Sequence, residues 1–142
     1  MRFPNPTHGI EAGEYYLQGH VEIFHNSEWG TICNNHFDNN GADVLCRMMG
    51  HASGVYNTSY KQPTVIPSTR IWLDNVRCMG GETNIKRCRH DSWGSGNCSH
   101  SQDVAIRCYG IQYSLIVSNA FHLICLFSLI CPNSRLTQNR MF

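Results

Sequence analysis

Alternating apolar and polar residues predict β-strands at three places along the chain. Around the polar turn at residues 25–28 the alternation continues on both sides, which predicts two antiparallel strands joined as a hairpin with one buried face. The alternating positions are Val21, Ile23, Trp29, Thr31 and Cys33. Residues 71–76 predict another strand, with Ile71 and Leu73 on one side and Trp72 on the other, and residues 104–108 predict a last, half-buried strand.

Apolar residues recur at helical spacing in residues 41–49. Ala42, Leu45, Cys46 and Met49 share one face at this spacing, so the face is predicted to pack into the core. The expected capping residues are Asn39 or Asn40 at the start of the helix and Gly50 at its end.

Two other segments carry weaker patterns. Residues 51–68 are rich in Ser, Thr, Asn and Pro without a periodic apolar face, and are predicted to form a surface loop. Residues 83–89 fit a single helical turn capped by Thr83. A length of 142 residues leaves room for one domain with extensions.

Eight cysteines in 142 residues indicate a protein of an oxidising compartment. Four of them, Cys78, Cys88, Cys98 and Cys108, follow one another at intervals of ten. Zinc sites usually take cysteines in close pairs two to four residues apart, whereas wide intervals suit bridges between separate strands and loops. Disulfides are therefore favoured over a metal site, and the protein is expected to be extracellular or at the cell surface. Spacing alone leaves the pairing open.

The charges are few and unevenly distributed. A net charge of +1 and a charged fraction of 15% do not indicate the clearly basic face of a nucleic-acid-binding protein, so no nucleic acid is expected as a partner. Residues 70–108 nevertheless hold six Lys or Arg and four acidic residues, against two and six in residues 1–50. The candidate ligand-binding residues in this basic part are Lys86, Arg87, Arg89 and Arg77. A polyanion would be attracted to them; the alternative is an ordinary solvated surface.

The two ends of the chain differ from its middle. Residues 1–9 lack the apolar run of a signal peptide and are interpreted as an N-terminal extension of a chain that continues upstream. Residues 110–132 form an apolar segment, in which 111–131 carry no Lys, Arg, Asp or Glu, and residues 133–142 form a short polar tail. The apolar segment is long enough for a transmembrane helix. The alternative is an artefactual extension of the chain.

Catalytic signatures are missing from the sequence. The histidines are scattered without an H-E-x-x-H helix, and no G-x-S-x-G turn is present. His100 lies near Cys98, but a bridged cysteine has no thiolate to offer. The protein is therefore not expected to be an enzyme. An N-x-[ST] motif makes Asn57 the expected glycosylation site, while Asn97, in a second such motif, adjoins a bridging cysteine.

Several of these motifs, taken together and in this order, resemble a scavenger receptor cysteine-rich (SRCR) domain. They are residues 20–26 (HVEIFHN), 28–33 (EWGTIC), 44–50 (VLCRMMG), 71–78 (IWLDNVRC) and 97–103 (NCSHSQD). The resemblance covers about residues 10–109, which are therefore interpreted as the domain. It implies an α+β fold in which a curled, mainly antiparallel sheet cradles one α-helix.

The resemblance also implies three disulfides. The pairs that the resemblance implies are Cys33–Cys98, Cys46–Cys108 and Cys78–Cys88. Leu17 and His51 stand at the positions of the fourth pair found in eight-cysteine members, so this chain resembles the six-cysteine group A type.

Family members that bind ligands through calcium use an acidic pair and a glutamate at positions that match Asn34, Asn35 and Gln102 here. All three are amides, and calcium affinity falls as carboxylates are removed. The candidate ligands for a weakened calcium site are Asp38, Asp74, Asp103, Asn34, Asn35 and Gln102. The alternative is that the aspartates cap turns, and no cofactor is expected to be required.

The resemblance implies a function in binding. The chain is expected to be an extracellular, scavenger-receptor-like module that recognises proteins or polyanionic ligands, with a membrane tether if residues 111–131 span the bilayer. The alternative function is a non-catalytic accessory domain of a larger extracellular protease or oxidase, of which this chain is a fragment.

Overall fold

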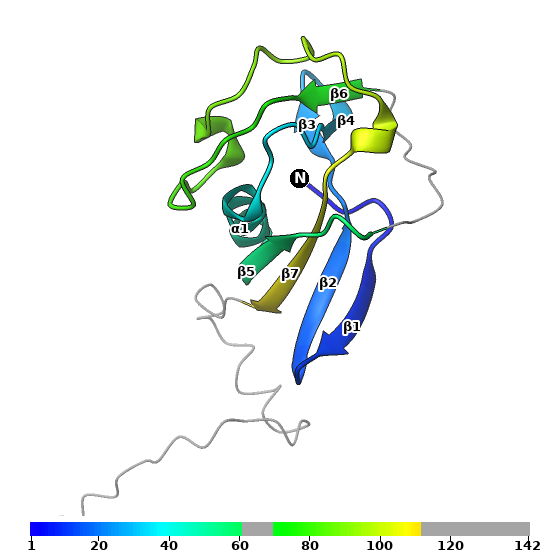
Figure 1. Ribbon diagram of the computed structural model, residues 1–142, viewed down its shortest axis with the longest axis vertical. Helices are drawn as coiled ribbons and strands as arrows, with labels where there is room; N and C mark the ends of the chain where they lie inside the picture. Colours follow the sequence, from blue (N-terminus) through cyan, green and yellow to red (C-terminus); the bar gives the residue numbers. More distant parts are fainter. Residues whose placement is uncertain (61–69, 112–142) are drawn as a thin grey trace, which may run out of the picture. The chain divides into compact units, whose positions relative to one another are not determined.

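Two β-sheets and one α-helix are the main elements in the part of the chain that the computed structural model describes, residues 1–60 and 70–111 (Figure 1). The expected polar tail, and the apolar segment from residue 112 onward, lie outside these residues. Among the described residues, no helix has the length and apolar character needed to cross a membrane.

The larger sheet is antiparallel, with strand order β1-β2-β7-β5. Its strands are β1 (Thr7–Glu11), β2 (Glu14–His20), β7 (Ala105–Ile111) and β5 (His51–Tyr56). A tight turn at Ala12 and Gly13, with φ values of 49° and 82°, joins β1 to β2. The predicted last strand is confirmed as β7, whereas β1 and β2 were not predicted. The expected domain boundary at residue 10 falls inside β1.

The prediction of a surface loop over residues 51–68 is wrong for its first part, because His51–Tyr56 form β5 at the edge of this sheet. Only Gly54 is buried in β5, and a glycine contributes nothing to an apolar pattern. Residues 61–69 lie outside the described residues.

The smaller sheet contains the predicted hairpin, β3 (Ile23–His25) and β4 (Glu28–Ile32), which pair antiparallel. The turn between them lies at Asn26 and Ser27, both with positive φ. The predicted strand at residues 71–76 is confirmed in part as β6 (Arg70–Leu73), which pairs parallel to β4. The mainly antiparallel arrangement is confirmed, although the described strands form two sheets rather than one.

The predicted helix is confirmed as α1 (Asn39–Met48), which packs against β5 and β7 (Figure 1). The expected cap at Asn39 or Asn40 is wrong, because the Asp38 carboxylate accepts hydrogen bonds from the backbone N–H groups of Asn40 (3.0 Å) and Gly41 (3.2 Å). Asn39 instead accepts a hydrogen bond from the Tyr56 N–H of β5. Two short 3-10 helices, η1 (Ile85–Arg87) and η2 (His100–Gln102), complete the described elements, and η1 is capped by Asn84 rather than by the expected Thr83.

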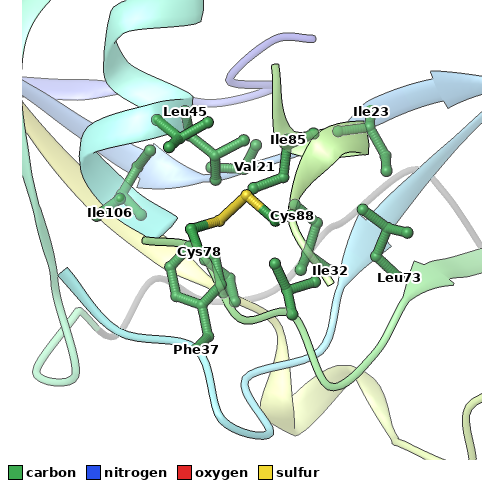
Figure 2. Close-up of a cluster of buried hydrophobic side chains, with 14 of the residues drawn as sticks. Val21, Ile23, Ile32, Phe37, Leu45, Leu73, Cys78, Ile85, Cys88 and Ile106 are labelled. Carbon is green, nitrogen blue, oxygen red and sulfur yellow. A yellow bond between two sulfur atoms is a disulfide. The ribbon is translucent and has the colours of Figure 1, made fainter. Parts of the chain in front are cut away.

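All three expected disulfides are present, and their Cα–Cα separations lie in the usual range for such bonds. Cys33–Cys98 (6.2 Å) ties the end of β4 to the loop before η2, and Cys46–Cys108 (5.4 Å) ties α1 to β7. Cys78–Cys88 (4.7 Å) lies inside the apolar core, where Figure 2 shows it between Leu45 of α1 and Ile32 of β4.

Candidate ligand-binding surface

Arg77 and Arg89 face each other across a short antiparallel bridge that lies outside the two sheets. The Arg77 N–H donates to the Arg89 carbonyl (2.8 Å), and the Arg89 N–H donates to the Arg77 carbonyl (3.1 Å). The adjacent residues, Cys78 and Cys88, are joined by the buried disulfide. The backbone that carries these two arginines is therefore held by hydrogen bonds and by a covalent bond.

A polar hollow of about 290 Å³ adjoins this bridge, and its lining residues are Asn75, Arg77, Arg89, His90 and Asp91. The Asn75 side-chain amide donates to the Asp91 carboxylate (2.6 Å), and the His90 ring lies 2.5 Å from the Asp91 carbonyl. Asp91 thus has a neutral partner and makes no ion pair with a described residue. Asp91 was not predicted from the sequence to lie beside the ligand-binding residues, because the hollow depends on the pairing of residues 77 and 89.

Lys86 and Arg87 lie on η1 and are exposed. The Lys86 ammonium lies 5.7 Å from the centroid of the Trp93 ring, and that ring is 5.4 Å from the ring of His90. Trp93 in turn stacks on His25 at 3.9 Å. An aromatic group therefore connects the cation on η1 with the polar hollow.

The described residues divide the cations into paired and unpaired groups. Arg2, Arg70 and Arg107 form ion pairs with Glu22, Glu28 and Glu11, respectively. The Arg47 guanidinium donates to the carbonyls of Gly80 and Glu82. No ion pair with another described residue involves the four predicted ligand-binding residues, Arg77, Lys86, Arg87 and Arg89. We call these four the basic surface.

Arg107 belongs to a separate network on the larger sheet. Its guanidinium and the Tyr109 hydroxyl both donate to the Glu11 carboxylate, at 2.7 and 2.5 Å. The hydrogen bond from Tyr109, followed by that from Arg107, lowers the pKa of Glu11. Because Glu11 compensates Arg107, this cation is less available to an anionic ligand than those of the basic surface.

The amides at the expected calcium positions do come together, next to the Cys33–Cys98 disulfide. The Asn34 N–H donates to the Gln102 carbonyl (2.8 Å), and the Asn35 amide donates weakly to the Cys98 sulfur (3.3 Å). The Asp38 carboxylate does not join these amides, because it caps the N-terminus of α1.

Two of the candidate calcium ligands, Asp74 and Asp103, are buried. Asp74 accepts a hydrogen bond from the Asn75 N–H (2.7 Å), and one of its oxygens lies 3.5 Å from the Cys98 sulfur. Asp103 accepts from His100 (2.8 Å). Burial raises the pKa of Asp103, against the opposing effects of Thr31 and His100.

The donor set around these residues fits calcium poorly. Among the described residues, only two groups of three Cys, His, Asp or Glu side chains lie close enough to share an ion. Each consists of a disulfide and one carboxylate, Asp74 in one and Glu82 in the other. Calcium needs several oxygen ligands, and a disulfide sulfur has no thiolate charge. The weakness of the calcium site stays a prediction.

The predicted glycosylation site, Asn57, follows β5 and is half-buried. Its side-chain nitrogen, which would carry the glycan, donates to the Gln18 side chain (2.9 Å), and its side-chain oxygen accepts from the Ser59 N–H (3.2 Å). A glycan at Asn57 would compete with the hydrogen bond to Gln18, so glycosylation here stays a prediction.

Comparison with known proteins identifies relatives of this chain. It is 45% identical over 91 residues to macrophage receptor MARCO of Mesocricetus auratus, covering 64% of this chain and 18% of the receptor. It is 40% identical over 91 residues to lysyl oxidase homolog 3A of Danio rerio, covering 64% of this chain and 12% of that protein. The chain therefore spans less than a fifth of the length of these relatives.

Solved structures agree with the sequence matches. The SRCR domain of mouse MARCO, crystallised in a dimeric form, superposes with a TM-score of 0.60 at 42% identity, covering 70% of this chain and 92% of that domain. The third SRCR domain of murine neurotrypsin gives a TM-score of 0.52 at 34% identity, covering 64% of this chain and 84% of that domain.

A sequence model of the scavenger receptor cysteine-rich domain matches residues 11–109. The match includes the six paired cysteines and the single α-helix of the described residues. The chain therefore belongs to the scavenger receptor cysteine-rich domain family.

Proposed function

We propose that this chain is an extracellular ligand-binding module that recognises polyanions through its basic surface. The observation that carries the proposal is the absence of ion pairs with described residues at Arg77, Lys86, Arg87 and Arg89, all of which are exposed. Uncompensated cations raise the local concentration of anionic ligands and speed their association. The similarity to a macrophage receptor, and the three disulfides typical of an oxidising compartment, support the extracellular assignment.

Heparin chromatography tests this proposal. The variant Lys86→Ala/Arg87→Ala/Arg89→Ala removes three of the four cations, and we expect it to elute at clearly lower salt, because retention depends on the number of cations that displace counterions. Arg70→Ala is the matched control, since Arg70 is exposed but already paired with Glu28. We expect the same retention with calcium and with a chelator. Elution of the triple variant with the unchanged protein would contradict the proposal.

A second candidate function is that of an accessory domain in a larger extracellular protein. The similarity to a lysyl oxidase homolog, over only 12% of that protein, favours it. In this case too we propose that the module binds rather than catalyses; the six described cysteines are bridged, so none of them offers a thiolate nucleophile. Sequencing the full transcript tests it, and an open reading frame that adds no catalytic domain would contradict it.

A further inference from the structure

Within the basic surface, we infer that Arg77 and Arg89 form a clamp for a single tetrahedral oxyanion, of the kind carried by sulfate and phosphate monoesters. The inference rests on the proposed function and goes further: it names one binding position, the polar hollow beside the Arg77–Arg89 bridge, and one ligand chemistry.

The first argument is the juxtaposition of two like charges. Residues 77 and 89 exchange both backbone hydrogen bonds, so their Cα atoms are about 5.5 Å apart and their side chains leave the same face of the bridge. Like charges placed directly opposite each other destabilise a strand pair. Neither guanidinium forms an ion pair with a described residue. A bound anion between them would replace this repulsion with attraction.

The second argument is rigidity. Cys78 and Cys88 directly adjoin the two arginines and are joined by a disulfide inside the core, and Figure 2 shows this bond surrounded by apolar side chains. Val76, on the other side of Arg77, is 1% exposed. Because the backbone of the clamp is held in place before a ligand arrives, less conformational entropy is lost on binding.

The third argument concerns the other groups in the hollow. Asp91 lines it and repels anions, although its carboxylate is engaged by the Asn75 amide at 2.6 Å. The two guanidinium groups and the one carboxylate give the hollow a small net positive charge. Charge alone would therefore attract an anionic ligand to the hollow only weakly. The guanidinium groups instead offer planar, two-pronged hydrogen bonding, which matches sulfate and phosphate oxygens.

Substitution by lysine separates geometry from charge. Arg77→Lys/Arg89→Lys keeps both charges but removes the two-pronged donors. Lys86→Arg/Arg87→Lys is the matched control on η1. The probes are a heparin hexasaccharide for sulfate and inositol hexakisphosphate for phosphate, titrated calorimetrically into each variant at one fixed salt concentration.

We expect the dissociation constant for at least one probe to rise roughly tenfold in Arg77→Lys/Arg89→Lys and to change less than about twofold in the control. The probe that shows the loss identifies the source of the oxyanion. Thermal melts of each variant verify that it is folded.

The outcomes also separate the clamp from the proposed function. If the lysine pair binds both probes as tightly as the unchanged protein while the triple alanine variant loses heparin retention, the basic surface stands and the clamp is refuted. If neither set of substitutions weakens binding, both are refuted.

Discussion

At the scale of single residues, burial decides what Asp103 does. The resemblance to the family made Asp103 a candidate calcium ligand. In the structure Asp103 is buried, with 7% of its surface exposed, and its carboxylate hydrogen-bonds to His100. One of its carboxylate oxygens has no hydrogen-bond partner among the residues that the structure describes. Desolvation therefore dominates, and it raises the pKa of Asp103.

A raised pKa implies a definite dependence of stability on pH. The folded state binds the Asp103 proton more tightly than the unfolded state, so this contribution is fully present below the ordinary pKa and is lost as pH rises through the raised value. We predict that the unchanged protein loses stability relative to Asp103→Asn over this interval. Thermal melts at a series of pH values from about 3 to 7 measure the difference.

The control for this measurement is Asp91→Asn, which changes an exposed aspartate with a side-chain partner. A difference in melting temperature between the unchanged protein and Asp103→Asn that stays constant over the acidic range would contradict the prediction.

At the scale of elements, periodic patterns were sufficient for some of the fold. The hairpin of β3 and β4 and the helix α1 were predicted because each buries one face of its own, so their apolar residues repeat at a period of two or of 3.6. β5 was missed because it makes its contact with α1 through Gly54, which packs against Cys46 and Ala42. A close approach of backbones is a tertiary event without an apolar signal.

This contact makes Gly54 sensitive to substitution. A methyl group at Gly54 would lie 2.3 Å from the Cys46 sulfur and 2.6 Å from the Ala42 carbonyl oxygen, so helix and strand would have to move apart. We predict that Gly54→Ala lowers the free energy of unfolding by about 1–3 kcal/mol, as other overpacked cores do. Urea denaturation measures the loss.

Gly81→Ala is the matched control, because nothing lies within 4 Å of a methyl group there. We expect it to change the free energy of unfolding by less than about 0.5 kcal/mol. Equal effects of the two substitutions would show that the packing of β5 on α1 is not as described.

At the scale of the whole domain, the disulfides supply constraints that its small core needs. Cys33–Cys98 and Cys46–Cys108 join residues 65 and 62 positions apart. In the chain-entropy model each such bridge stabilises by about 4 kcal/mol, and the ten-residue Cys78–Cys88 loop by about 3 kcal/mol. Together these values are of the same order as the whole stability of a typical domain.

We therefore predict that reduction unfolds the domain. Calorimetry with and without a reductant, with alkylation of the released thiols, should show a cooperative transition only in the oxidised protein. A transition of the reduced protein near the oxidised midpoint would contradict the prediction.

The sequence by itself determined that the chain is a disulfide-rich domain with a helix and several half-buried strands, because cysteine spacing and apolar periodicity are local properties. Family motifs added the disulfide pairing. Only the tertiary structure decided that residues 51–56 form a strand and that Asp103 is buried. The tertiary structure likewise decided that Arg77 pairs with Arg89 beside the buried Cys78–Cys88 disulfide. These features arise from contacts between residues that are distant in the chain, so they cannot be predicted from local sequence patterns.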